Sequence, residues 1–198
     1  MPTFTDTFAR HVLGPGHEFY VGQLPQNLMV SDAQFDELWK LHPTGYLTIM
    51  LHGRSVRTPR WQQAFGMDYH YSGQLNKALP TPVTLQPLLE WTREHICADL
   101  NGVLLNWYDG TLGHYIGAHR DSTVGIVAGT PIVTLSFGED RKFRLRPWKG
   151  RGFIDFFAKH GIVFVMPSQT NQAYTHEVPH PLRSKGRRIS LTFRAFEP

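Results

Sequence analysis

A change in hydrophobic period near residue 103 constrains this chain more than any other feature. From there onward, polar and apolar residues alternate in short runs, and Gly, Pro, Asp and Asn separate the runs as in an antiparallel sandwich or barrel. The runs cover residues 103–108, 132–137, 142–145, 153–157, 162–166 and 189–196. Because no internal repeat is present, we predict an α+β fold built on a double-stranded β-helix (jelly-roll) barrel, with helices packed outside it.

Two amphipathic helices are predicted before the strands. Ser31 and Gln34 have the form of a capping box in front of an apolar helical repeat, which predicts that one helix begins at Ser31. A second apolar set recurs at helical spacing after Pro82. Its members are Leu85, Leu88, Leu89, Ile96 and Leu100.

We divide the chain at residue 102. Residues 1–102 are expected to hold an irregular arm over the first thirty residues, the helices, and a lid-like segment over 53–73, all packed on the barrel. Residues 103–198 are expected to form the jelly-roll catalytic core. Because 198 residues with 41% hydrophobic content can bury one full core, we expect a single globular domain overall.

Composition excludes several classes of protein. Cys97 is the only cysteine, so neither an intrachain disulfide nor a thiolate zinc cluster can form. No apolar stretch approaches the ~20 residues that span a bilayer, so we expect a soluble, intracellular chain without a membrane partner. The sequence does not determine the oligomeric state, and we take a monomer as the simplest expectation. A net charge of +4 is compatible with an anionic partner and supports nucleic acid only weakly.

The candidate metal ligands are His119, Asp121 and His176. Two residues one position apart on a strand point the same way, so the side chains of His119 and Asp121 can meet one ion. His176 follows an apolar strand and the turn predicted over 166–172, and it can return a second imidazole to the pair. Two His and one carboxylate leave positions open for dioxygen and a chelating co-substrate. For any one of these residues alone, a polar turn is the simpler interpretation.

The segment from Arg188 to Arg194 alternates without a break between polar and apolar residues. Arg188, Ser190, Thr192 and Arg194 therefore share one face of a strand. Two guanidiniums on a buried face need anions, and a dicarboxylic acid would pair with both. The alternative is an edge strand that carries solvated charges.

Four blocks of this sequence resemble the AlkB family of Fe(II)/2-oxoglutarate-dependent dioxygenases, which dealkylate nucleic acids. The resemblance covers residues 57–196 in the family's order. The blocks are Thr58-Pro59-Arg60 with Tyr69-His70-Tyr71-Ser72-Gly73; Asn106-Trp107-Tyr108-Asp109-Gly110; Ile116-Gly117-Ala118-His119-Arg120-Asp121; and the segment from Arg188 to Arg194 after His176.

The resemblance implies a reaction and a set of roles. Fe(II), 2-oxoglutarate and O2 would be used to remove alkyl groups from base nitrogens in DNA or RNA, with release of formaldehyde, succinate and CO2. The residues implied to bind 2-oxoglutarate are Asn106, Tyr108, Arg188, Ser190, Thr192 and Arg194. The residues expected to contact an extruded base and its phosphates are Arg57, Arg60, Trp61, Tyr69, Tyr71 and Arg120.

The sequence departs from the family's pattern shortly after the acidic ligand. Asp121 is followed by Ser122 and Thr123, where base-repairing relatives commonly carry an acidic residue that can accept a hydrogen bond from an exocyclic amine. Two alternatives therefore stay open beside base dealkylation. One is an oxygenase that hydroxylates a small molecule or a protein, and the other is a barrel that binds metal and nucleic acid without turnover.

Overall fold

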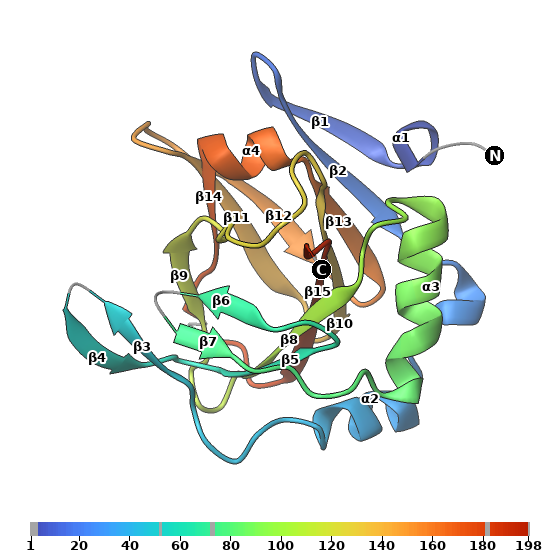
Figure 1. Cartoon of the computed structure of the whole chain (residues 1–198), viewed down its shortest axis with the longest axis vertical. Helices are drawn as coiled ribbons and strands as arrows, with labels where there is room; N and C mark the ends of the chain where they lie inside the picture. Colours follow the sequence, from blue (N-terminus) through green and yellow to red (C-terminus); the bar gives the residue numbers. More distant parts are fainter. Residues whose placement is uncertain (1–3, 52, 72–73, 181–182, 198) are drawn as a thin grey trace.

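The computed structural model describes residues 4–51, 53–71, 74–180 and 183–197, and two antiparallel sheets dominate this part of the chain (Figure 1). From edge to edge, the major sheet contains β1 (Ala9–Gly14), β2 (His17–Gln23), β13 (Ile162–Met166), β10 (Ile132–Gly138), β15 (Arg187–Arg194), β8 (Gly102–Asp109) and β5 (Trp61–Phe65). The minor sheet contains β12 (Ile154–Ala158), β11 (Arg141–Pro147), β14 (Tyr174–Val178) and β9 (Ile116–His119). Two small hairpins pair β3 (Thr48–Leu51) with β4 (Arg54–Arg57) and β6 (Tyr69–Tyr71) with β7 (Gln74–Asn76). The predicted jelly-roll is confirmed.

Helices cover the outer face of the major sheet. The longer ones are α2 (Asp32–Trp39) and α3 (Gln86–His95), which lie beside this sheet and away from the minor one (Figure 1). The capping box predicted at Ser31 and Gln34 is present at the start of α2. The shorter segments are α1 (Phe4–Thr7), η1 (Gln26–Leu28), η2 (Val83–Leu85) and α4 (Ser168–Ala173). Within the described residues, every helix is too short or too polar to cross a bilayer.

The apolar core has two layers, one on each face of the major sheet. Leu38 and Leu88 from the helices pack with Leu191 of β15 on the outer layer. The inner layer lies between the two sheets and includes Phe19 and Phe143. Since side chains alternate along a strand, the apolar residues of β15 that face the helices force its polar residues to face the space between the sheets. This space contains the site described below.

Two local predictions from the sequence were wrong. The first thirty residues do not form an irregular arm, because β1 and β2 make a hairpin whose β2 strand pairs with β13. Phe19 and Tyr20 are buried on opposite faces of β2, so the strand shows no simple alternation. The segment after Met166 was predicted as a turn, but its residues 168–173 form α4.

The predicted lid over 53–73 divides into different elements. The strand β5 belongs to the major sheet, where it pairs with β8, whereas β4 and β6 belong to the small hairpins. Three strands of the major sheet come from before residue 103, so the boundary predicted at residue 102 passes through this sheet. That the chain forms one globular domain remains a prediction.

Candidate metal centre and anion pocket

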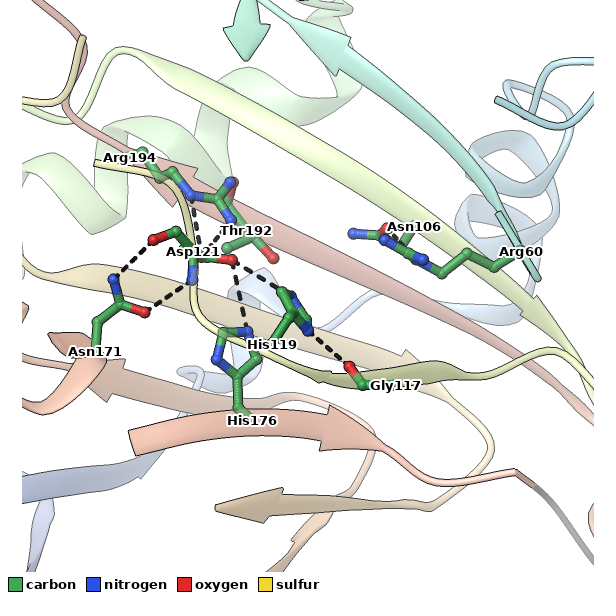
Figure 2. A network of polar contacts seen from close by, with 9 residues as sticks. All are labelled: Arg60, Asn106, Gly117, His119, Asp121, Asn171, His176, Thr192 and Arg194. Atoms are coloured by element: carbon green, nitrogen blue, oxygen red, sulfur yellow. Dashed lines mark hydrogen bonds and ion pairs between the residues drawn. The ribbon is translucent and has the colours of Figure 1, made fainter. Parts of the chain in front are cut away.

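His119 and His176 lie directly opposite each other on neighbouring strands. Their Cα atoms are partners in the register of β9 and β14, and their ring centroids are 4.3 Å apart. Asp121 follows β9 and directs its Oδ1 atom to both rings, at 3.5 Å from Nε2 of His119 and 3.6 Å from Nε2 of His176 (Figure 2). The three ligand atoms all lie within 4.8 Å of one another, so they can surround one ion at ordinary metal–ligand bond lengths.

The ligand atoms are held in place by neighbouring polar groups. Nδ1 of His119 lies 2.8 Å from the carbonyl oxygen of Gly117, a contact that leaves Nε2 of the neutral ring as the atom able to bind a metal. Asn171 of α4 donates to the carbonyl oxygen of Asp121 and accepts its backbone N–H, at 3.1 and 3.0 Å (Figure 2). Sequence reasoning missed Asn171, since it had assigned the segment before His176 to a turn.

Asp121 is a buried carboxylate that stays ionised. Burial by itself would raise its pKa, but the Arg194 guanidinium and the two histidines hold that pKa well below its usual range. Arg194 donates to Oδ2 of Asp121 from Nε at 3.2 Å and from Nη2 at 2.5 Å. Burial, followed by the neighbouring His119, lowers the pKa of His176 to about 3, so this ring is neutral at pH 7. A neutral imidazole and an ionised carboxylate are the forms that bind metals.

Arg188 provides an anion-binding group inside the same cavity. Its side chain is 1% exposed, and its Nε donates to Oγ of Ser136 at 2.9 Å. Both Nη1 and Nη2 are buried without a hydrogen-bond partner among the described residues. The guanidinium lies 5.0 Å from the ring centre of Tyr108, and burial lowers the pKa of Arg188 to about 10, which leaves it charged at pH 7. A carboxylate bound there would accept the two free donors.

Strand register explains why the remaining predicted co-substrate residues share this cavity. Ser190 of β15 is opposite Asn106 of β8, and Arg188 is opposite Tyr108. These four residues, with Thr192 and Arg194, line the cavity that also contains the three candidate ligands. The cavity therefore brings all six predicted 2-oxoglutarate residues together with the His-Asp-His group.

The charge balance of the buried residues favours a dianion. Among the described residues, the buried guanidiniums are Arg60, Arg141, Arg188 and Arg194, whereas Asp121 is the one buried carboxylate. An excess of buried positive charge is unfavourable unless a bound anion compensates for it. The residues present therefore fit a ferrous ion held by two imidazoles and a carboxylate, with a dicarboxylic acid beside it.

A second groove shares the wall residues Arg60, Ile116 and His119 with this cavity, and we call it the mouth groove. Two of the predicted substrate residues, Arg57 and Arg120, are exposed at its walls. Arg120 donates to the carbonyl oxygen of Gln172 at 3.0 Å, and its guanidinium lies 4.2 Å from the ring centre of the exposed Trp148. The other walls of the mouth groove include Thr58, Arg60, Tyr115, His119 and Ser122.

Three other predicted substrate residues are in positions that do not suit a phosphate or base contact at the surface. Arg60 is 3% exposed and donates to Oδ1 of Asn106 at 2.7 Å, so it supports a wall shared by the two cavities (Figure 2). Trp61 is stacked on His42, with ring centroids 4.1 Å apart, and belongs to an internal aromatic cluster. Tyr69 is 1% exposed beneath the Arg194 guanidinium. The sequence predicted a surface role for these residues from their aromatic or basic side chains. It could not show that they are buried, because burial depends on the tertiary structure. The side chain of Tyr71 lies outside the described residues.

Comparisons with known proteins agree with this geometry. Residues 37–194 match the model of the 2OG-Fe(II) oxygenase superfamily. The chain is 32% identical over 171 residues to the Mus musculus protein named DNA oxidative demethylase ALKBH2, covering 78% of this chain and 70% of that protein. It is 31% identical to the Homo sapiens protein of the same name, covering 83% of this chain and 68% of that one. A solved structure titled "The structure of OsALKBH1" superposes with a TM-score of 0.60 at 13% identity, covering 94% of this chain and 99% of that one, which supports the fold alone.

Proposed function

The chain belongs to the AlkB family within the 2OG-Fe(II) oxygenase superfamily, and we propose that it removes methyl or other alkyl groups from base nitrogens of nucleic acid by oxidative dealkylation. The single observation that carries this proposal is the convergence of His119, Asp121 and His176 beside the unpaired donors of Arg188 in one buried cavity. Fe(II), 2-oxoglutarate and O2 are the cofactor and co-substrates of this enzyme.

We assign the binding roles as follows. His119, Asp121 and His176 would hold the iron, and Arg188 would pair with the carboxylate of 2-oxoglutarate that lies farther from it. When bound, the iron and 2-oxoglutarate supply the oxidising chemistry, so that 2-oxoglutarate, O2 and an N-methyl group become succinate, CO2, formaldehyde and a free N–H. The protein contributes binding, orientation and exclusion of water.

Residues around the three candidate metal ligands orient them and exclude water from the site. Arg194 and Asn171 fix Asp121, the former through its carboxylate and the latter through its backbone. The ring of Phe143 stacks on His176 with centroids 5.4 Å apart, and Ile116 and Ile132 add apolar walls. An apolar wall beside a charged centre strengthens its electrostatic interactions and keeps solvent from the oxidising site.

DNA is the partner that we propose, because the relatives that match over most of this chain are named DNA oxidative demethylases. Arg57 and Arg120 at the mouth groove are suited to phosphate contacts. Arg60, Trp61 and Tyr69 keep at most an indirect role in this proposal. The predicted contact of Tyr71 stays a prediction.

Two measurements test the function. The iron-loaded protein should convert 2-oxoglutarate to succinate slowly without a substrate, and faster with methylated oligonucleotides, with formaldehyde released in step. Oligonucleotides with each methylated base, single-stranded and paired, form the panel. Succinate formation with no formaldehyde from any member would favour an oxygenase that acts on a different substrate. Absence of both products in iron-loaded protein would favour the non-catalytic barrel.

A further inference from the structure

The mouth groove has an unusual charge pattern for a site that receives a methylated base. Arg57, Arg60 and Arg120 line it, and no Asp or Glu is present among its described lining residues. A third groove, which we call the outer groove, adjoins it and is lined by residues 118–124 with Trp148, Asn171 and Gln172. It adds a single carboxylate, Asp121, which is already bound to Arg194 and directed at the candidate metal position. A base that enters the mouth groove therefore meets the exposed guanidiniums of Arg57 and Arg120 and no available carboxylate, while Arg60 adds a buried positive charge behind the wall.

Nearby acidic residues outside the groove do not change this balance. Asp155 is paired with Arg144 at 2.5 Å and with Lys142 at 3.2 Å. Glu177 is paired with Arg146 at 2.9 Å. Each of these carboxylates is neutralised on the minor sheet by at least one adjacent cation, and neither lines the mouth groove.

Ser122 lies where the two grooves meet. It directly follows Asp121 and lines both the mouth groove and the outer groove. Its Oγ accepts the backbone N–H of Val124 at 3.2 Å, so its hydroxyl hydrogen is available to be donated. Ser122 and the neighbouring guanidiniums are donors, and donors recognise carbonyl oxygens.

Methylated bases fall into two classes, which differ in charge and in whether they present a donor or an acceptor. Adenine N1 and cytosine N3 carry a lone pair, so methylation there adds a positive charge beside an exocyclic amino group, which is a donor. Guanine N1 and thymine N3 carry a hydrogen that the methyl group replaces, so the methylated base stays neutral and presents a carbonyl acceptor. A groove lined by cations and donors repels the first pair and complements the second.

We propose that this enzyme prefers neutral, carbonyl-bearing bases, 3-methylthymine and 1-methylguanine, over the cationic 1-methyladenine and 3-methylcytosine, and that Ser122 is the specificity-determining residue. This rests on the proposed dealkylation of bases and names its substrate class. The methyl group leaves as formaldehyde, one oxygen atom of O2 goes to that product and the other to succinate, and the base nitrogen regains its hydrogen for 1-methylguanine and 3-methylthymine.

The test uses the whole chain, loaded with iron, and four single-stranded DNA oligonucleotides that differ only in the methylated base. Formaldehyde and demethylated base are measured together with succinate. We expect kcat/KM for the two neutral bases to exceed that for the two cationic bases by about tenfold or more. Equal or greater activity on the cationic bases would overturn this inference and leave the dealkylase function intact. Succinate without demethylation of any of the four would overturn the dealkylase function itself.

A pair of variants assigns the preference to Ser122. Ser122→Asp places a carboxylate at the groove and should shift the ratio toward the cationic bases by about tenfold, whereas Ser122→Asn has a similar size without the charge and should not. Succinate formation without substrate and the melting temperature report whether each variant is folded. An unchanged ratio in a folded Ser122→Asp protein would remove Ser122 from this role, and the wild-type comparison decides the preference by itself.

Discussion

Arg188 is a buried cation with hydrogen-bond donors that the described protein groups do not use. Its guanidinium is buried and makes one hydrogen bond through Nε to Ser136, and its other two nitrogens have no hydrogen-bond partner within the part of the chain that the structure describes. Buried donors without partners each cost ~1–3 kcal/mol, so natural proteins keep them for a reason. Pairing with a carboxylate of the co-substrate gives that reason.

Replacing Arg188 by Met should therefore raise the KM for 2-oxoglutarate by about tenfold to a hundredfold, since a charge-assisted pair of ~1.5–3 kcal/mol is lost. The rate of succinate production, measured as a function of 2-oxoglutarate concentration, gives this KM. The neighbouring Arg187 is paired with Asp36 on the outside of the molecule, and Arg187→Met serves as the matched control. Equal KM values for the two variants would exclude Arg188 from the pocket.

Asn171 acts on the candidate metal ligand through the backbone. Its amide makes two hydrogen bonds to the peptide groups of Asp121, and Asn171→Ala removes both. Losses of this kind typically weaken metal binding by about 10–100-fold, so the variant should need more Fe(II) for half-maximal activity and bind Mn(II) more weakly by titration. Gln169→Ala, at an exposed position of the same helix, should bind like the wild type. Equal affinity in the two variants would argue against a role for Asn171.

At the scale of elements, His114 connects segments that the strands alone would leave apart. It lies between β8 and β9, accepts the backbone N–H of Asp109, and contacts the Tyr46 hydroxyl at 3.0 Å. Its own carbonyl oxygen accepts from Arg141 of β11, which also donates to Pro179 after β14. His114 thus links both sheets close to the site.

This connection should make stability depend on pH. Burial lowers the pKa of His114 in the folded protein, so on acidification the unfolded chain takes up this proton first. The free energy of unfolding should accordingly fall as pH drops below ~6.5, the ordinary histidine pKa. His114→Gln should show a shallower fall between pH 7 and 5.5 in denaturant titrations. Tyr46→Phe, which removes one hydrogen bond of ~1 kcal/mol and no titrating histidine, should lower stability with the wild-type slope. Identical slopes for wild type and His114→Gln would contradict this account.

For the whole molecule, the site sits between the two sheets, so a ligand bound there should stabilise both. Strands β9 and β14 carry the two candidate histidine ligands, Asp121 follows β9, and β8 and β15 carry the co-substrate residues. A ligand present at one hundred times its Kd stabilises the folded state by ~2.7 kcal/mol, which corresponds to roughly 5–10 °C in Tm for a chain of this size.

Mn(II) and 2-oxoglutarate together should therefore raise the Tm by an amount of that order, and a chelator should reverse the rise. In Arg188→Met, the part of the rise due to 2-oxoglutarate should disappear while the part due to the metal persists. Thermal melts monitored by circular dichroism measure both. If the wild type and Arg188→Met gained equally from 2-oxoglutarate, the diacid would bind elsewhere.

The sequence by itself determined which side chains share a face and where elements begin. Alternation from Arg188 to Arg194 predicted one polar face, and the capping box at Ser31 predicted the start of α2, because both are local properties of the backbone. His119 and Asp121 were recognisable for the same reason. The family's motif order then extended this local information to His176.

The tertiary structure alone decided which elements become neighbours and how deeply each side chain is buried. The register that sets His119 opposite His176, the contact of Asn171 with Asp121, and the burial of Trp61 against His42 all join segments distant in the chain. Side-chain period reports the face of a strand but not the strand it pairs with, since pairing depends on packing of the whole core. The groove without a carboxylate, on which the specificity proposal rests, exists only in that packed arrangement.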